Sequence, residues 1–195
     1  MANLLQPFAG RRAGAAAERL IGHFGGLGRA LLAPREQLDA ALADNPALVD
    51  TLVAARDLFG AGLHEQLRRS CISASASDYL RYLRFTIGKG TVERLHVTFV
   101  TPDWGYIADD QIAVGTVSQV QANLRFLLGR AFDVGAHGIL LAHNHPSGSA
   151  EPSPEDIAQT QRIARITSAV GVELVDHLIV GADTIVSMRD RGLLA

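Results

Sequence analysis

Residues 138–156 carry the most informative pattern in the chain and read Gly138-Ile-Leu-Leu-Ala-His143-Asn-His145-Pro-Ser-Gly-Ser-Ala-Glu-Pro-Ser153-Pro-Glu-Asp156. Its apolar start indicates a β-strand, in which alternate side chains share one face. His143 and His145 would therefore point the same way, with Asn144 on the opposite face. A lone histidine in a strand is usually a core or surface residue. For two in register before a Pro-Ser-Gly loop, the spacing leaves metal ligation and a structural role equally open.

The end of this stretch has the form of a helix start. Ser153 suits the N-cap, Pro154 the first helical position, and an acid at the third position can reach back to the cap. The capping interpretation also fixes Asp156 rigidly where a metal ion would use it. Two histidines and one carboxylate, with a fourth position left to water, are typical of a hydrolytic zinc centre rather than a structural one.

Composition limits the class of protein. The chain has 195 residues, of which 48% are hydrophobic, enough for one ordinary domain and a small additional unit. A net charge of −2 argues against a chain built mainly to grip nucleic acid. The single cysteine, Cys71, excludes a disulfide framework and a cysteine-based zinc site. No apolar run approaches a membrane span and no secretory signal begins the chain, so we expect a cytoplasmic protein without membrane contact.

Hydrophobic spacing divides the chain into two parts. The first part predicts a small helical unit, with short helices over 14–24 and 35–43 and a further apolar face from Leu48, Val49, Leu52, Val53 and Phe59. The polar stretch 70–77 is a plausible boundary, followed by a short helix to residue 85. Beyond it we expect strands around 95–99 and 106–114, a helix over 120–131, the histidine strand, a helix over 154–170, and strands over 172–180 and 184–188. The order β-β-α-β-α-β-β predicts an α/β (α+β) domain with a mixed sheet.

The spacing of His143, His145, Ser153 and Asp156 resembles the signature of JAB/MPN-type (JAMM) zinc metalloproteins. The fuller string around it is similar to the RadC-like branch of that family. So are Gly115-Thr116 upstream and the tail Asp176-His177-Leu-Ile-Val-Gly181. The resemblance covers roughly residues 73–195.

The resemblance implies a JAB/MPN-like, cytidine-deaminase-like mixed sheet flanked by helices over 73–195. It implies that His143, His145 and Asp156 bind Zn²⁺ and that Ser153 hydrogen-bonds the developing oxyanion. The activity would be hydrolysis of an amide or isopeptide bond of a peptide or protein, with a zinc-bound water as nucleophile. Asp176 and His177 would support the metal ligands or the fold, because zinc-bound histidine usually donates its other N–H to such a partner.

The family's catalytic acid/base is a glutamate on the strand before the Gly-Thr pair. Aligning Gly115-Thr116 puts Asp110 at that position, while the adjacent Asp109 faces the other way. Aspartate keeps the carboxylate but is one methylene shorter, and a displacement of about 1 Å costs on the order of a hundredfold in rate. A non-catalytic zinc-binding module for a protein partner is therefore an alternative to the hydrolase.

Residues 1–70 would correspond to the helix-hairpin-helix that RadC-like chains usually carry. That motif presents backbone N–H groups to a phosphate from a Gly-x-Gly turn. The matching stretch 38–48 has no such glycines and has Asp44 where an anion needs a donor. We therefore expect a degenerate helical region with weak support for DNA binding, although RadC-like proteins are labelled DNA repair factors.

Overall fold

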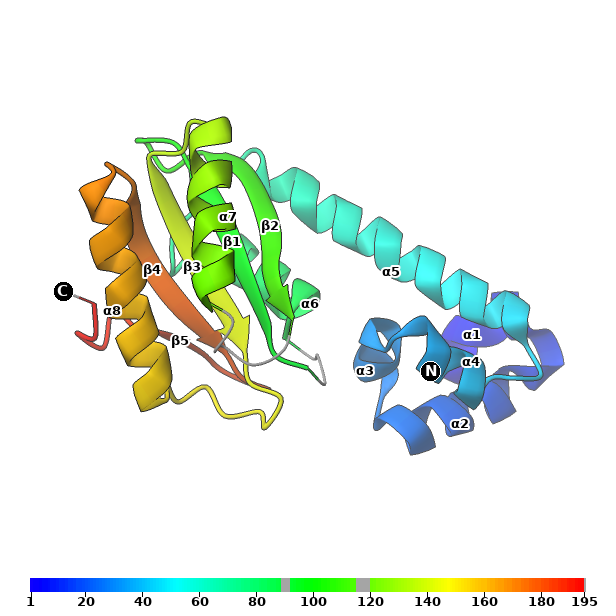
Figure 1. Cartoon of the computed structure of the whole chain (residues 1–195). Coiled ribbons are helices and arrows are strands. Elements are labelled where there is room, and N and C mark those ends of the chain that lie inside the picture. Colours follow the sequence, from blue (N-terminus) through cyan, green and yellow to red (C-terminus); the bar gives the residue numbers. More distant parts are fainter. Residues whose placement is uncertain (89–91, 115–119, 195) are drawn as a thin grey trace. The chain divides into compact units, whose positions relative to one another are not determined.

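The computed structural model describes residues 1–88, 92–114 and 120–194. The chain forms two compact units, Met1–Gly62 and Leu63–Ala195. Figure 1 shows the helical first unit in blue to cyan and the α/β second unit in cyan-green to red. The division falls inside helix α5 (Pro46–Leu67), whose last residues belong to the second unit.

The first unit is built from helices around a small apolar core. They are α1 (Ala2–Ala9), a 3₁₀ turn (Gly10–Arg12), α2 (Ala13–Phe24), α3 (Leu27–Leu32), α4 (Arg35–Ala41) and the start of α5. The helices expected over 14–24 and 35–43 are confirmed to within two residues, whereas α1 and α3 were not expected. Leu48, Val49 and Leu52 are buried, but Phe59 is 56% exposed and so lies off the core face. Gly25 ends α2 in the left-handed conformation that glycine adopts most readily.

The second unit contains one mixed sheet. Its strands are β1 (Arg94–Val100), β2 (Tyr106–Val114), β3 (Gly138–Asn144), β4 (Glu173–Val180) and β5 (Ile185–Ser187). The order across the sheet is β2-β1-β3-β4-β5. β3 and β4 are parallel, and the other neighbours are antiparallel. The predicted order β-β-α-β-α-β-β and the mixed sheet are confirmed.

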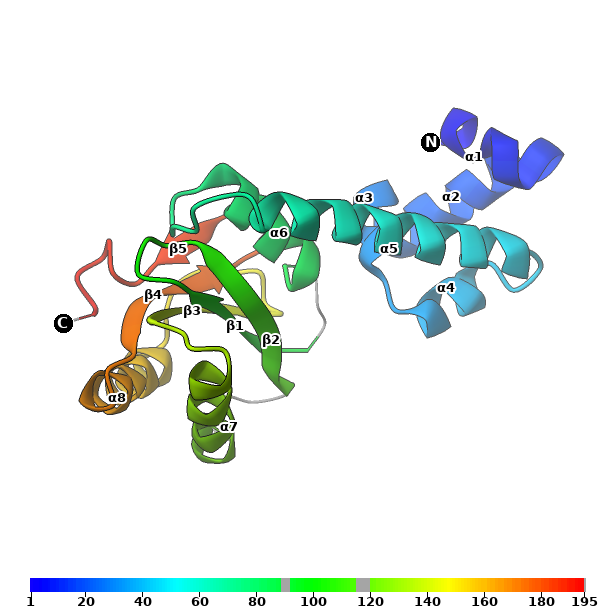
Figure 2. The ribbon, with the colours of Figure 1, turned by 90° about the horizontal axis from the view of Figure 1, so that it is seen from above.

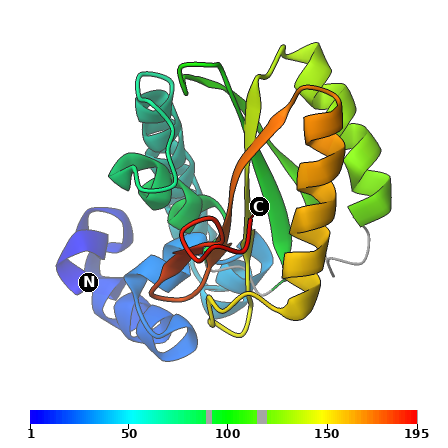
Figure 3. The same cartoon turned by 90° about the vertical axis from the view of Figure 1, so that its left-hand side faces the viewer.

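Helices cover both faces of this sheet, as Figures 2 and 3 show. Helices α7 (Val120–Asp133) and α8 (Pro154–Ala169) pack on one face through an apolar cluster that includes Val97, Phe99 and Ile163. Helix α6 (Ser77–Thr86) and the end of α5 pack on the other face. This is the JAB/MPN-like arrangement expected from the resemblance. Among the residues that the structure describes, no helix is both long and apolar enough to cross a membrane.

The connection between β3 and β4 positions the candidate site. Parallel neighbouring strands need a crossover, and α8 supplies it. The chain therefore leaves the end of β3 at Asn144, passes through a loop, and enters α8 at Pro154. This loop docks on the turn after β4, where the Ala182 N–H donates to the Gly148 carbonyl over 2.9 Å. The end of a buried strand and the start of a helix are thereby held side by side.

Candidate metal centre

His143 and His145 lie at the end of β3, on the face covered by α7 and α8. Every residue of β3 is buried, and His143 is only 1% exposed. The side chain of His145, one residue past the strand, is 14% exposed. Their Nε2 atoms are 2.8 Å apart. Two imidazole nitrogens at this distance either share a proton or face one cation.

Asp156 enters the site from the first turn of α8. The predicted capping box is confirmed: the Asp156 N–H donates to Ser153 Oγ over 3.1 Å, and the Ser153 N–H donates to Asp156 Oδ2 over 2.8 Å. The Ser153 hydroxyl also donates to Asp156 Oδ2, over 2.6 Å. Asp156 is 3% exposed, so the cap holds a buried carboxylate in one orientation.

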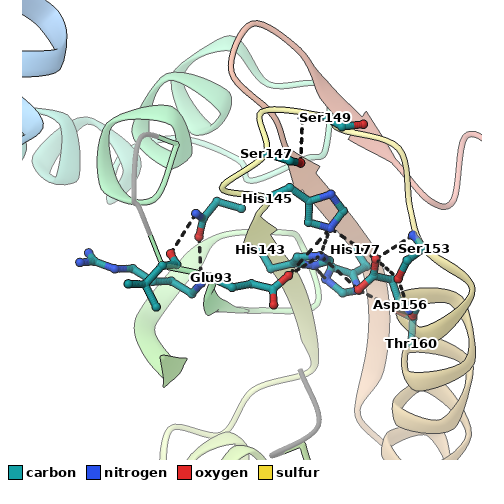
Figure 4. Close-up of polar contacts among 12 residues, drawn as sticks. Glu93, His143, His145, Ser147, Ser149, Ser153, Asp156, Thr160 and His177 are labelled. Carbon is teal, nitrogen blue, oxygen red and sulfur yellow. Dashed lines mark hydrogen bonds and ion pairs between the residues drawn. The ribbon is translucent and has the colours of Figure 1, made fainter. Parts of the chain in front are cut away.

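The structure brings the three predicted ligands together (Figure 4). Asp156 Oδ1 lies 3.2 Å from His143 Nε2, and Asp156 Oδ2 lies 3.4 Å from His145 Nε2. Ligand atoms of a tetrahedral zinc site with bonds of about 2.0–2.1 Å are about 3.3 Å apart. The two nitrogen–oxygen separations match this spacing, whereas the 2.8 Å between the two Nε2 atoms is shorter. The donor set of two nitrogens and one carboxylate is compatible with a metal ion.

Hydrogen bonding keeps the Asp156 carboxyl ionised. Burial by itself would raise its pKa, but the contacts from His143 and Ser153 outweigh that effect and hold the pKa well below its usual range. An ionised carboxylate beside two imidazoles is the state that a metal ion requires, because the ligating atoms must be free of protons.

Glu93 is a fourth member of the site that the sequence interpretation missed. Its Oε1 lies 3.9 Å from the Nε2 atoms of both His143 and His145. These three side chains form a group compatible with a metal ion, with all ligand atoms within 4.8 Å of one another. Figure 4 shows the Glu93 side chain directed toward the histidines.

A signal for Glu93 was present in the sequence. Leu95, Val97 and Phe99 alternate along one face of β1, and Glu93 continues the same alternation. Because β1 pairs with β3 with Leu95 opposite His143, that face carries the histidines. The missing information was that β1 and β3 are neighbours.

Asp110, the expected acid/base, lies away from the two histidines. It sits on β2, which β1 separates from β3. Its Oδ2 accepts from Arg130 Nε of α7 over 2.8 Å, and its side chain is 28% exposed. Among the described residues, Glu93 rather than Asp110 has its carboxylate beside the histidines. The Gly115-Thr116 pair used to align Asp110 lies outside the described residues.

A series of buried hydrogen bonds orients the His143 ring from the side opposite its Nε2 atom. Its Nδ1 lies 2.8 Å from Nε2 of His177 on β4, and His177 Nδ1 lies 2.6 Å from the Thr160 hydroxyl. That hydroxyl donates to the Asp156 carbonyl over 2.6 Å. Burial lowers the pKa of His177 well below its ordinary value, so the ring is neutral and accepts from His143. The series of hydrogen bonds therefore runs from one candidate ligand, His143, to the backbone of another, Asp156.

Asp176, next to His177, supports the fold around the site. Its Oδ1 accepts the N–H groups of His177 and Arg189 over 2.6 and 3.0 Å, and its Oδ2 accepts the Ser187 hydroxyl. These bonds tie β4 to β5 and to the chain that follows it. The expectation that Asp176 and His177 have supporting roles agrees with these contacts.

The fold and the site together define an α/β protein with a metal-competent cluster at the end of a central strand. Residues 73–193 match the RadC-like JAB domain. The chain is 35% identical over 178 residues to a UPF0758 protein of Neisseria meningitidis serogroup C (strain 053442), covering 91% of this chain and 79% of the relative. It is 34% identical to UPF0758 proteins of Marinomonas sp. (strain MWYL1) and Leptothrix cholodnii (strain ATCC 51168 / LMG 8142 / SP-6), again over 91% of this chain and 80% of each relative. The chain belongs to the RadC-like JAB domain family.

Proposed function

We propose that the protein is a zinc-dependent hydrolase of the JAMM type that cleaves an amide or isopeptide bond in a peptide or protein. The observation that carries the proposal is the Glu93 carboxylate, which lies 3.9 Å from both histidine Nε2 atoms. A hydrolytic centre needs a proton acceptor beside its ligands, and a carboxylate on a neighbouring strand meets that need.

His143, His145 and Asp156 would hold the ion. Bound Zn²⁺ polarises a carbonyl and lowers the pKa of a water molecule to about 7. Glu93 would take the proton from the attacking water and return it to the leaving amine. Its side chain is 23% exposed, so it can reach both the buried histidines and a substrate arriving from solvent.

Ser153 has two possible tasks in this scheme. Its hydroxyl donates to Asp156 Oδ2, which steadies a ligand. Donating to a developing oxyanion would require the hydroxyl to turn away from Asp156. The N-cap bond from the Asp156 N–H to Ser153 Oγ survives that rotation, because there the oxygen is the acceptor.

The main reason to expect a non-catalytic module was the shorter carboxylate at Asp110. Glu93 removes that reason, because a full-length glutamate lies beside the ligands. The first unit likewise gives little support to phosphate binding, since Asp44 pairs with Arg19 over 2.8 Å. We therefore favour the hydrolase over a partner-binding or DNA-associated module.

The test compares three variants of the whole chain. Purified protein should bind one zinc ion, and His143→Ala should abolish that binding. Glu93→Gln should keep the zinc but lower hydrolysis of a quenched fluorescent peptide library by about 10²–10⁴-fold, the usual contribution of a general base. Asp110→Asn is the matched control and should keep both. Absence of stoichiometric zinc, or full activity in Glu93→Gln, would refute the proposal.

A further inference from the structure

Asn144, the residue between the two histidines, makes contacts that metal ligation does not explain. It is 1% exposed, on the opposite face of β3 from His143. Its Oδ1 accepts the Arg94 N–H over 2.8 Å, and its Nδ2 donates to the Val92 carbonyl over 3.1 Å. Those two backbone groups belong to the residues immediately before and after Glu93.

The strand register explains why this side chain reaches that backbone. β1 and β3 run antiparallel, with Val97 opposite Leu141 and Leu95 opposite His143. The next pair of residues in this register is Arg94 and Asn144. There the Asn144 side chain bonds to the backbone of the approaching segment.

The chemistry of the contact is specific to asparagine. One short side chain must offer an acceptor to Arg94 and a donor to Val92 at the same time. Aspartate offers only the acceptor, and alanine offers neither. Because both partners are backbone groups, the contact fixes the main chain at Glu93 without touching its carboxylate.

We propose that Asn144 is a positioning residue for Glu93. By holding the chain on either side of Glu93, it keeps the carboxylate aimed at the two histidines on the other face of the sheet. The inference rests on the proposed role of Glu93 as proton acceptor. One tripeptide, His143-Asn-His145, then supplies two ligands from one face and the support for the acid/base from the other.

The first measurement does not depend on activity. Asn144→Ala should speed hydrogen exchange of the Arg94 amide by at least about tenfold, the effect of losing one buried hydrogen bond. Asn144→Asp keeps the acceptor and should protect this amide better than Asn144→Ala does. Zinc affinity should stay within about threefold of wild type in both variants, because the ligands keep their supports. An unchanged exchange rate of the Arg94 amide in Asn144→Ala would overturn the inference.

The second measurement asks whether Asn144 acts through Glu93. Asn144→Ala should lower kcat/KM by roughly ten- to a hundredfold, as expected for a misplaced catalytic group. In the Glu93→Gln background the same change should add little, because interacting residues are not additive. If the double variant lost kcat/KM by the product of the two single losses, the inference would be overturned. Asn45→Ala removes an asparagine that caps Leu48 in the first unit and should leave kcat/KM unchanged.

The two proposals fail in different ways. If the wild-type protein cleaves no amide bond, the proposed function fails, and the Arg94 exchange rate alone decides whether Asn144 fixes the chain beside Glu93. If hydrolysis is present and requires Glu93 but the double variant behaves additively, only the positioning role of Asn144 fails.

Discussion

His143 Nδ1 lies 2.8 Å from His177 Nε2, with both rings buried. If His143 Nε2 faces a metal ion, its Nδ1 carries the hydrogen and donates to His177. The neutral His177 ring then donates from its own Nδ1 to Thr160. Each bond fixes the direction of the next, so His177 selects both the tautomer and the orientation of a candidate metal ligand.

Removing His177 should therefore weaken metal binding. We expect His177→Leu to lower zinc affinity by about 10–100-fold, the usual cost of losing such a partner. His177→Gln should lose less, since its amide offers an acceptor and a donor. Competition with a chromophoric chelator measures the affinity. His96, a buried histidine on the opposite face of the sheet, is the control, and an equal loss in His96→Leu would contradict the assignment.

Thr160 follows His177 in this series of hydrogen bonds, so replacing it should also lower zinc affinity, but by less. Thr160→Val keeps the shape but cannot accept from His177 or donate to the Asp156 carbonyl, whereas Thr160→Ser keeps both bonds. We expect zinc affinity to fall about tenfold in the first variant and little in the second. Thr167→Val, at another fully buried threonine of α8, is the matched control. Equal zinc affinities of Thr160→Val and Thr167→Val would contradict the role of Thr160 in supporting the metal site.

Ser153 should contribute to stability whether or not it takes part in a reaction. Ser153→Ala removes the N-cap of α8 and is expected to lower the free energy of unfolding by about 1 kcal/mol, within the usual range for such caps. Urea unfolding of the zinc-free protein measures this without interference from metal binding. Ser168→Ala, at an exposed serine near the end of α8, should change stability by less than about 0.5 kcal/mol. Equal stability of the two variants would mean that the cap contributes nothing.

The parts of the site that follow from local backbone geometry could be predicted from the sequence. The capping box occupies four consecutive residues, Ser153 to Asp156, and its bonds depend only on the start of one helix. The alignment of His143 and His145 depends only on strand alternation. Neither requires knowledge of what packs against what.

Glu93 could not be found in this way, because its place depends on the pairing of two strands far apart in the sequence. Alternation puts it on the face of Leu95, but only the β1–β3 register brings that face to His143. The interpretation that chose Asp110 used distance along the chain from Gly115-Thr116. It therefore selected a residue of β2, which has β1 between it and the histidine strand.

Asp109 lies next to Asp110 on β2, and its carboxylate contacts several polar side chains on the α6 side of the sheet. Its Oδ2 accepts the Tyr82 hydroxyl over 2.6 Å and lies 3.2 Å from His96 Nε2. Its Oδ1 accepts the Tyr106 hydroxyl and lies 3.2 Å from His64 Nε2. Asp109 thus ties the end of α5, α6 and β1 to β2.

Asp109 should make stability depend on pH in the acid range. Burial alone would raise its pKa, but the contacts with His96, Tyr106 and Tyr82 more than offset this and hold the pKa well below the ordinary 3.8. Because the folded-state pKa is depressed, the stabilisation is fully present above the unfolded value and is lost as pH falls toward the folded one. Asp109→Asn should cost about 1.5–3 kcal/mol at neutral pH, as for hydrogen bonds to a charged group.

Urea unfolding from about pH 7 to about pH 2 tests this dependence. The stability gap between wild type and Asp109→Asn should be constant down to about pH 5 and should shrink below it. Asp110→Asn is the matched control, one residue along the same strand. Its ion pair with Arg130 is partly exposed, so this substitution should cost less stability than Asp109→Asn. A gap for Asp109→Asn that stays constant to pH 2 would mean that the donors around Asp109 do not depend on its charge.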